Sequence, residues 1–133
     1  MIRVGIFGCT GSIGRNAIEI ARHNADRIRV TALAAGGNES ELLHLAKLLK
    51  VKKLALGKES ATLACGPQAL RALAADPEID LVVNAVVGAA GLAVTLGALD
   101  GGKQLALANK ESLVMAGDLV MKRAAARGIA VRP

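Results

Sequence analysis

The sequence Gly8-Cys9-Thr10-Gly11-Ser12-Ile13-Gly14 is the segment that decides the fold. An apolar run of strand length, residues 2–8, leads into it, and residues 12–23 follow it with apolar side chains at helical spacing. The first glycine permits a sharp turn, the second lets a ligand approach the backbone, and the third allows helix and strand to pack closely. This pattern predicts a phosphate-binding turn between a first strand and a first helix.

The amides of Ser12 and Ile13 are the groups expected to bind a phosphate. They lie in the first turn of the predicted helix, where they have no intrahelical partner and where the peptide dipoles favour an anion. The spacing is GxxGxxG in place of GxGxxG, so a glycine-rich turn kept only for packing is an alternative. The strand before and the helix after favour the binding interpretation. We assign no chemistry to Cys9, a small residue that fits a tight loop.

Apolar runs of strand length alternate with segments of helical periodicity along the chain. This alternation predicts a parallel sheet, here a Rossmann-like, doubly wound α/β fold with helices on both faces. The expected strands are residues 2–8, 27–34, 53–56, 79–87, 103–107 and 129–131, with a short extra strand through 62–64. The expected helices are 12–23, a helix capped by Asn38 or Ser40 that runs to Leu49, 66–74, 91–99 and 112–126. The expected buried face of the first helix consists of Ile13, Ala17, Ile20 and Ala21.

Length and composition indicate one domain. The 133 residues are 53% hydrophobic, which is enough for a single buried core. No apolar run is long enough for a membrane span. The chain has two cysteines and enough apolar residues for a core, so it requires no disulfide, and we expect a cytoplasmic protein. The net charge of +6 comes from scattered basic residues, and only one residue is aromatic, so nucleic acid is not the expected partner. An anionic small ligand fits the charge at least as well.

The end of the second predicted strand indicates which dinucleotide is bound. In NAD-binding folds an acidic residue there holds the ribose hydroxyls and repels the extra phosphate of NADP. Residues 31–38 read TALAAGGN, with no acid, and Glu39 is expected in the first turn of the next helix with its side chain turned away. NADP is therefore favoured over NAD, although this stretch holds no Arg or Lys to attract the phosphate.

Three further segments are expected at the carboxyl edge of the sheet, where ligands of parallel sheets bind. Residues 36–38 follow the second strand, 88–91 follow the central strand, and 109–112 follow the strand that ends at Leu107. The small residues of 88–91 let a flat ring lie against the backbone. Residues 109–112, of sequence NKES, form a polar cluster in an apolar half of the chain; a helix-capping turn with a solvated lysine is the alternative interpretation.

Three motifs together resemble the amino-terminal, NADPH-binding domain of the 1-deoxy-D-xylulose 5-phosphate reductoisomerase family. They are GCTGSIG at 8–14, VVGAAGL at 86–92 and ANKESLV at 108–114, of which the last is the specific one, and the resemblance covers essentially the whole chain. It implies that Lys110 contacts the sugar phosphate substrate. The residues that it implies for contacts with NADPH are Thr10, Gly11, Ser12, Ile13, Gly36, Gly37, Asn38, Asn109 and Glu111.

The resemblance also implies a reaction. Members of this family rearrange 1-deoxy-D-xylulose 5-phosphate and reduce it with NADPH to 2-C-methyl-D-erythritol 4-phosphate, a step of isoprenoid precursor biosynthesis, and a divalent metal, Mg or Mn, holds the substrate oxygens. The complete enzyme is expected to be a homodimer. The acidic cluster that binds the metal would follow Pro133, so we expect no metal ligand and no catalytic residue in this chain. We therefore expect it to bind NADPH without turning over the substrate.

Gly37 departs from the family pattern, because several members carry Lys or another polar side chain there.

Two other functions also stay open at this point. One is another NADPH-dependent reductase with the same loop spacing, of the semialdehyde dehydrogenase or dihydrodipicolinate reductase type, against which ANKESLV argues. The other is a non-catalytic nucleotide-binding module, which turnover assays would distinguish from an enzyme.

Overall fold

A single sheet of six parallel strands forms the centre of the computed structural model, which describes residues 1–108, 121–122, 124–129 and 131–132. The strands are β1 (Ile2–Phe7), β2 (Ile28–Ala35), β3 (Lys53–Leu56), β4 (Leu81–Asn84), β5 (Gln104–Leu107) and β6 (Val131–Arg132). Their order is β3-β2-β1-β4-β5-β6, and the register pairs β1 with both β2 and β4. The strand order therefore reverses between β1 and β4, which is the switch point at which folds of this kind bind ligands.

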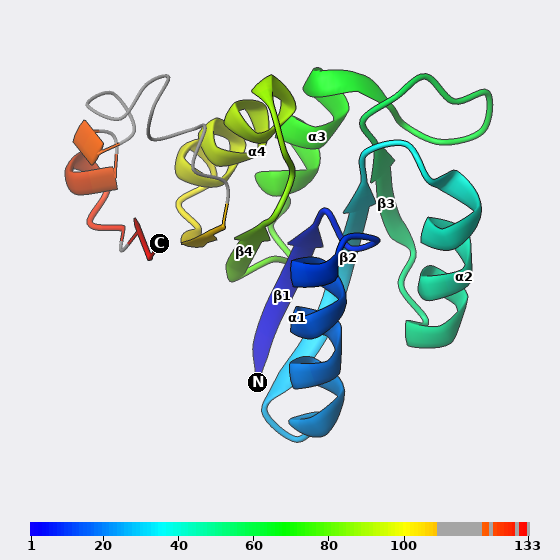
Figure 1. The fold of residues 1–133 in the computed structure, drawn as a ribbon. Helices are drawn as coiled ribbons and strands as arrows, with labels where there is room; N and C mark the ends of the chain where they lie inside the picture. Colours follow the sequence, from blue (N-terminus) through cyan, green and yellow to red (C-terminus); the bar gives the residue numbers. More distant parts are fainter. Residues whose placement is uncertain (109–120, 123, 130, 133) are drawn as a thin grey trace.

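Within the described residues, helices α1 to α4 cover the two faces of the sheet (Figure 1). They are α1 (Ser12–His23), α2 (Glu39–Leu49), α3 (Gly66–Ala74) and α4 (Ala89–Asp100). The first two pack on one face, and α3 and α4 pack on the other. Residues 121–122 and 124–126 are also helical, within the helix expected at 112–126, whose other residues lie outside the described ones. No helix in this described part is long and apolar enough to cross a membrane.

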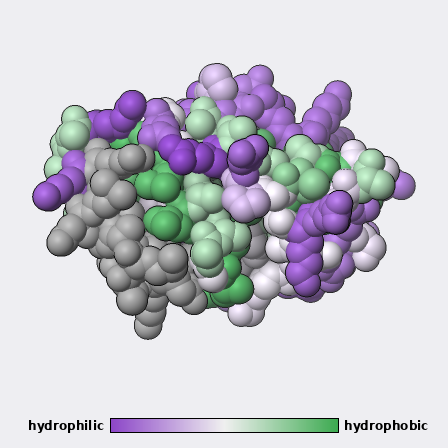
Figure 2. Space-filling model, turned by 90° about the horizontal axis from the view of Figure 1, so that it is seen from above, coloured by the Kyte–Doolittle hydropathy of each residue, from purple (hydrophilic) through white to green (hydrophobic). Residues whose placement is uncertain are grey.

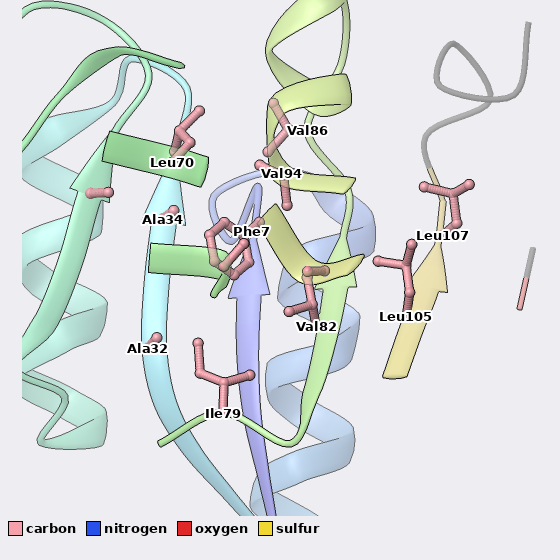
Figure 3. Close-up of a cluster of buried hydrophobic side chains, with 13 residues drawn as sticks. Phe7, Ala32, Ala34, Leu70, Ile79, Val82, Val86, Val94, Leu105 and Leu107 are labelled. Carbon is pink, nitrogen blue, oxygen red and sulfur yellow. The ribbon is translucent and has the colours of Figure 1, made fainter. Parts of the chain in front are cut away.

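The core is built by alternation along the central strands. Ile6 and Phe7 are neighbours in β1 and both are fully buried, but Ile6 packs with α1 and α2 whereas Phe7 packs with α3 and α4. In Figure 3 the ring of Phe7 lies among Ala34 of β2, Val82 of β4 and Leu70 of α3. Ala32 and Ala34 of β2 belong to the same buried cluster, so small side chains of the neighbouring strand accompany the one aromatic ring of the chain.

The doubly wound fold predicted from the sequence is confirmed, with three corrections to its elements. The central strand is shorter than the expected 79–87, because β4 comprises only Leu81–Asn84. The prediction of an extra strand at 62–64 is wrong, since these residues form no strand and only the next residue, Cys65, makes an isolated bridge, to Leu56. Helix α4 begins at Ala89, two residues before the expected start.

The buried face of α1 also differs from the expected one. Ile13 and Ile20 are 53% and 60% exposed, and the buried residues of the helix are Gly14, Ile18 and Ala21. A side chain at position 14 would collide with the carbonyl oxygen of Gly8. The helix therefore turns its glycine toward the sheet, and Ile18 and Ala21 lie on the same face because they follow at helical spacing.

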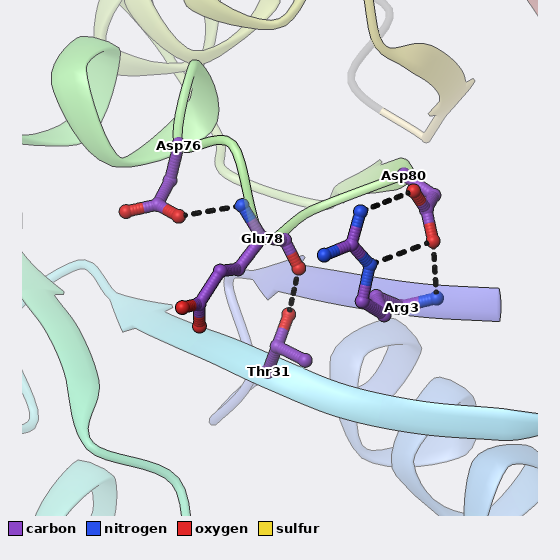
Figure 4. A network of polar contacts seen from close by, with 5 residues as sticks. All are labelled: Arg3, Thr31, Asp76, Glu78 and Asp80. Atoms are coloured by element: carbon purple, nitrogen blue, oxygen red, sulfur yellow. Dashed lines mark hydrogen bonds and ion pairs between the residues drawn. The ribbon is translucent and has the colours of Figure 1, made fainter. Parts of the chain in front are cut away.

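Polar contacts hold the amino-terminal edge of the sheet together (Figure 4). The carboxylate of Asp80, before β4, accepts hydrogen bonds from the backbone amide, Nε and Nη2 of Arg3 in β1 at 2.9, 3.1 and 2.9 Å. Thr31 Oγ1 in β2 donates to the carbonyl of Glu78, and Lys53 Nζ in β3 donates to Asp76 at 2.7 Å. The turn that precedes β4 is thus bonded to three strands at the edge opposite the glycine loop.

Candidate functional site

The glycine loop makes the sharp turn that its sequence predicts. Gly8 has φ +87°, and the amides of Gly8 and Cys9 both donate to the carbonyl of Ala34 at the end of β2, at 2.8 and 3.0 Å. A Cβ at Gly8 would lie 2.6 Å from the carbonyl oxygen of Ala85, which follows β4. The loop is therefore pressed between the ends of β2 and β4, over the switch point, and only glycine fits at position 8.

The amino end of α1 is open toward this loop. Gly11 caps the helix with extended backbone, φ −82° and ψ 173°, and no side chain makes a cap hydrogen bond. Ser12 and Ile13 are exposed, and their amides lie in the first turn, where no intrahelical carbonyl accepts them. The first turn holds no acidic residue. These amides and the helix dipole together provide a position suited to an anion.

A cleft of about 620 Å³ lies over the switch point. Four segments line it, each at or beyond the carboxyl end of a strand: the glycine loop with Gly8, Thr10 and Gly11, the turn Gly36, Gly37 and Asn38, the pair Gly57 and Lys58, and the residues Ala85, Val86, Val87 and Ala90. Seen from above, apolar side chains gather near the centre of this side of the molecule, with hydrophilic ones above them and to the right (Figure 2). The apolar residues that line the cleft, Val86, Val87 and Ala90, suit a flat ring beside a polar phosphate site.

A second cleft of the same size lies at the opposite edge, among the amino ends of the first three strands. It is about 620 Å³ and is lined by basic residues such as Arg29 and Lys52. Ligands of open parallel sheets bind beyond the carboxyl ends of the strands, where the loops diverge. The cleft with the glycine loop is therefore the candidate site.

Asn84, the last residue of β4, supports one wall of the cleft from inside. It is fully buried, and its Nδ2 donates to the carbonyl of Gly91 at 2.8 Å and to Thr95 Oγ1 at 2.9 Å. Its Oδ1 accepts from the amide of Val86 at 3.1 Å. These bonds join the strand end to the first turns of α4 and fix the residues between them. The residue was missed by sequence reasoning, although it is the one uncharged polar residue in the run 79–87.

The end of β2 is free of acid, as the sequence predicts. Glu39 is the first residue of α2, and its carboxylate accepts a hydrogen bond from Ser60 Oγ in the following loop. Asn38, and not Ser40, caps this helix, because its Oδ1 accepts from the amide of Glu41 at 3.2 Å. The side chain of Lys58, which follows β3, lies beside the same turn. This cation could not be predicted from the sequence around β2 alone.

Cys9 does not offer a nucleophile to the cleft. Its side chain is fully buried in the core on the α1 and α2 side. Burial raises the pKa of the thiol to about 12, so the thiolate is not populated near neutral pH. The interpretation of Cys9 as a small residue that fills a tight loop agrees with this environment.

The structure brings together most of the residues that the sequence analysis singled out. Thr10, Gly11, Gly36, Gly37 and Asn38 line one cleft. Ser12 and Ile13 follow directly in the exposed first turn of α1. The remaining residues expected at the site, Asn109, Lys110 and Glu111, lie outside the described residues.

Comparison with known proteins agrees with this geometry. The sequence model of a family described as 1-deoxy-D-xylulose 5-phosphate reductoisomerase matches residues 4–117. The chain belongs to this family. The 1-deoxy-D-xylulose 5-phosphate reductoisomerases of Xanthomonas campestris pv. campestris and Mycolicibacterium smegmatis are 44% and 48% identical to it, over 98% and 92% of this chain. These alignments cover 37% and 33% of the relatives, so the chain spans little more than a third of their length.

A solved reductoisomerase has the same fold as this chain. It is a crystal structure of DOX-P reductoisomerase in complex with NADPH, fosmidomycin and magnesium, which matches 98% of this chain with a TM-score of 0.90 and 38% sequence identity. The match covers 36% of the crystallised chain. The family membership decides against the semialdehyde dehydrogenase and dihydrodipicolinate reductase alternatives considered from the loop spacing.

Proposed function

We propose that this chain is the NADPH-binding domain of a 1-deoxy-D-xylulose 5-phosphate reductoisomerase. The observation that carries the proposal is the cleft over the switch point, where the glycine loop, the acid-free end of β2 and the small residues after β4 meet. A related structure of the same fold is a complex with NADPH. Family membership supports the choice of reaction, and the cleft supports the choice of cofactor.

The fit of NADPH rests on the backbone of the loop. Side chains at positions 8 and 14 would collide with neighbouring backbone, so the loop stays narrow and presents its amides to the cleft. The pyrophosphate binds at the amino end of α1, and the adenosine ribose lies at the turn after β2. The proposed NADPH contacts in the described part are Thr10, Gly11, Ser12, Ile13, Gly36, Gly37 and Asn38. Asn109 and Glu111 are proposed for NADPH as well, and Lys110 for the sugar phosphate.

The complete enzyme isomerises 1-deoxy-D-xylulose 5-phosphate and reduces the product to 2-C-methyl-D-erythritol 4-phosphate, and NADPH supplies the hydride. This chain binds and orients the cofactor at the carboxyl edge of its sheet. Among the described residues no group of three His, Cys, Asp or Glu side chains could hold a metal ion. That the complete enzyme uses a divalent metal, Mg or Mn, with its ligands outside this chain, and that it is a homodimer, stay predictions.

The substitution Gly11→Asp tests the cofactor site. A Cβ at Gly11 would meet only the carbonyl oxygen of Gly8 at 3.6 Å, and the extended backbone suits any residue, so the helix should still form. Aspartate is a good cap residue, but its carboxylate lies where the pyrophosphate binds and repels it. We expect NADPH affinity, measured by isothermal titration calorimetry, to fall at least about tenfold. Gly11→Asn, of the same shape without the charge, is the control and should lose much less; equal losses would contradict the electrostatic account.

The 133-residue chain is further proposed to bind NADPH without turning over the sugar phosphate. The relatives that catalyse the reaction are almost three times as long, and one relative is a complex with magnesium. Mixing the purified chain with 1-deoxy-D-xylulose 5-phosphate and either Mg²⁺ or Mn²⁺ should therefore cause no loss of NADPH absorbance, whereas a family member of full length oxidises NADPH under the same conditions. Metal-dependent oxidation by the short chain would refute this part of the proposal.

A further inference from the structure

Lys58 is held beside the turn after β2 by its own backbone. The amide of Gly57 donates to the carbonyl of Ala35 at 2.8 Å, and the amide of Lys58 donates to the carbonyl of Gly36 at 2.7 Å. These two bonds continue the pairing of β2 with β3 beyond Leu56, the last residue of the strand. The position of Lys58 in the cleft is therefore set by the sheet.

The side chain of Lys58 crosses the space that a side chain at position 37 would occupy. A Cβ built on Gly37 would lie 2.7 Å from Cδ of Lys58, 3.1 Å from its Cε and 3.4 Å from its Cγ. Because real Cβ atoms do not approach carbon so closely, glycine at position 37 is what lets the lysine lie there. The stem of Lys58 therefore lies against Gly37, in the turn after β2.

The charge of Lys58 is available to a ligand. The residue is exposed, and within the described residues no acidic side chain forms an ion pair with it. Arg15, another cation near the glycine loop, is engaged, because its Nε donates to the carbonyl of Thr10 at 3.0 Å and its guanidinium lies 3.5 Å from Glu41. Glu39, the acid that follows the turn, accepts a hydrogen bond from Ser60.

We propose that Lys58 binds the 2′-phosphate of NADPH and so determines the preference of this protein for NADPH over NADH; the inference rests on the proposed function. In doubly wound folds the adenosine ribose lies at the end of the second strand, and a cation there accommodates the extra phosphate. An ammonium and a phosphate form a charge-assisted hydrogen bond. Lys58 thus supplies from β3 the charge that the sequence of the turn after β2 lacks.

The test measures the dissociation constants of NADPH and NADH for Lys58→Met, which removes the charge and keeps the apolar stem. We expect NADPH to bind about tenfold more weakly, the loss of one charge-assisted hydrogen bond, and NADH to bind as it does to the parent. Lys52→Met is the matched control, because Lys52 is also exposed but lies before β3, at the opposite edge. It should change neither constant.

A relocated charge provides the second test. In Lys58→Ala, which removes the stem atoms that a side chain at 37 would meet, the further change Gly37→Lys should restore the preference for NADPH, because the new lysine starts from the turn itself. Lys58→Met with unchanged NADPH affinity, or with equal losses for NADPH and NADH, would overturn the assignment while leaving the proposed function intact. A parent protein that binds neither dinucleotide would instead refute the proposed function, and the inference with it.

Discussion

Asn84 supports the cleft through three hydrogen bonds made by one buried carboxamide. Replacement by alanine removes all three and leaves buried polar atoms of the loop and of α4 to find other partners. We expect Asn84→Ala to lower the free energy of unfolding by about 2–3 kcal/mol, measured by urea denaturation. NADPH affinity should fall as well, because the residues between β4 and α4 line the cleft.

The matched control for this prediction is Asn24→Ala at the far end of α1. The side chain of Asn24 donates a hydrogen bond from Nδ2 to the carbonyl of Ile20 at 2.8 Å, and the residue is only half-buried. Its loss should cost about 1 kcal/mol and leave NADPH affinity unchanged. An Asn84→Ala protein no less stable than Asn24→Ala would show that the buried bonds do not hold the wall.

Single residues were predictable from the sequence where their role depends on the local chain. Gly8 and Gly14 have the turn and the close packing that their spacing predicts. Asn84 and Lys58 were not predicted, because their partners belong to other elements. A lone amide in an apolar run is a signal that could have found Asn84. No such signal exists for Lys58, since its closeness to Gly37 depends on the pairing of β2 with β3.

At the scale of elements, the boundaries of α1 were predicted and its orientation was not. Periodicity alone selects Ile13 and Ile20 as core residues, since it weighs only hydrophobicity. The structure buries Gly14 because contact of the helix with the glycine loop fixes its rotation. For the same kind of reason β4 ends early: the amide of Val86 donates to Asn84 Oδ1, so the backbone leaves the ladder before the apolar run ends.

At the scale of the whole molecule, the candidate binding cleft lies at the carboxyl edge of the sheet, and a stabilising ion pair lies at the amino edge. The alternation of strands and helices predicts a parallel sheet, and the observed order β3-β2-β1-β4-β5-β6 brings the glycine loop, the turn 36–38 and Ala90 to one cleft. The expected loop 109–112 lies outside the described residues. At the opposite edge Arg3 and Asp80 pair across 77 positions of sequence. Nothing in the sequence indicates that pair, because it depends on β1 and the residue before β4 meeting at the same height of the sheet.

The pair at this edge predicts a dependence of stability on pH. The hydrogen bonds from the side chain and then the backbone of Arg3 lower the pKa of Asp80 to about 2, from an ordinary value of 3.8. A carboxylate whose pKa is lower in the folded than in the unfolded protein stabilises the fold above pH 3.8, and this contribution is lost as the pH falls through about 2. Asp80→Asn should therefore lower Tm by roughly 2–4 °C at pH 7, a modest effect for an exposed pair.

The difference in Tm between the parent and Asp80→Asn should shrink as the pH falls from about 4 to about 2, because the parent's carboxylate is protonated in that range and no longer differs in charge from the amide. Differential scanning calorimetry from pH 7 to pH 2 measures it. Asp26→Asn is the control: its side chain is 79% exposed and lies 3.9 Å from the neighbouring Arg27, so its Tm should follow that of the parent throughout. A difference for Asp80→Asn that stays constant down to pH 2 would mean that the lost hydrogen-bond geometry, and not the carboxylate charge beside Arg3, carries the effect.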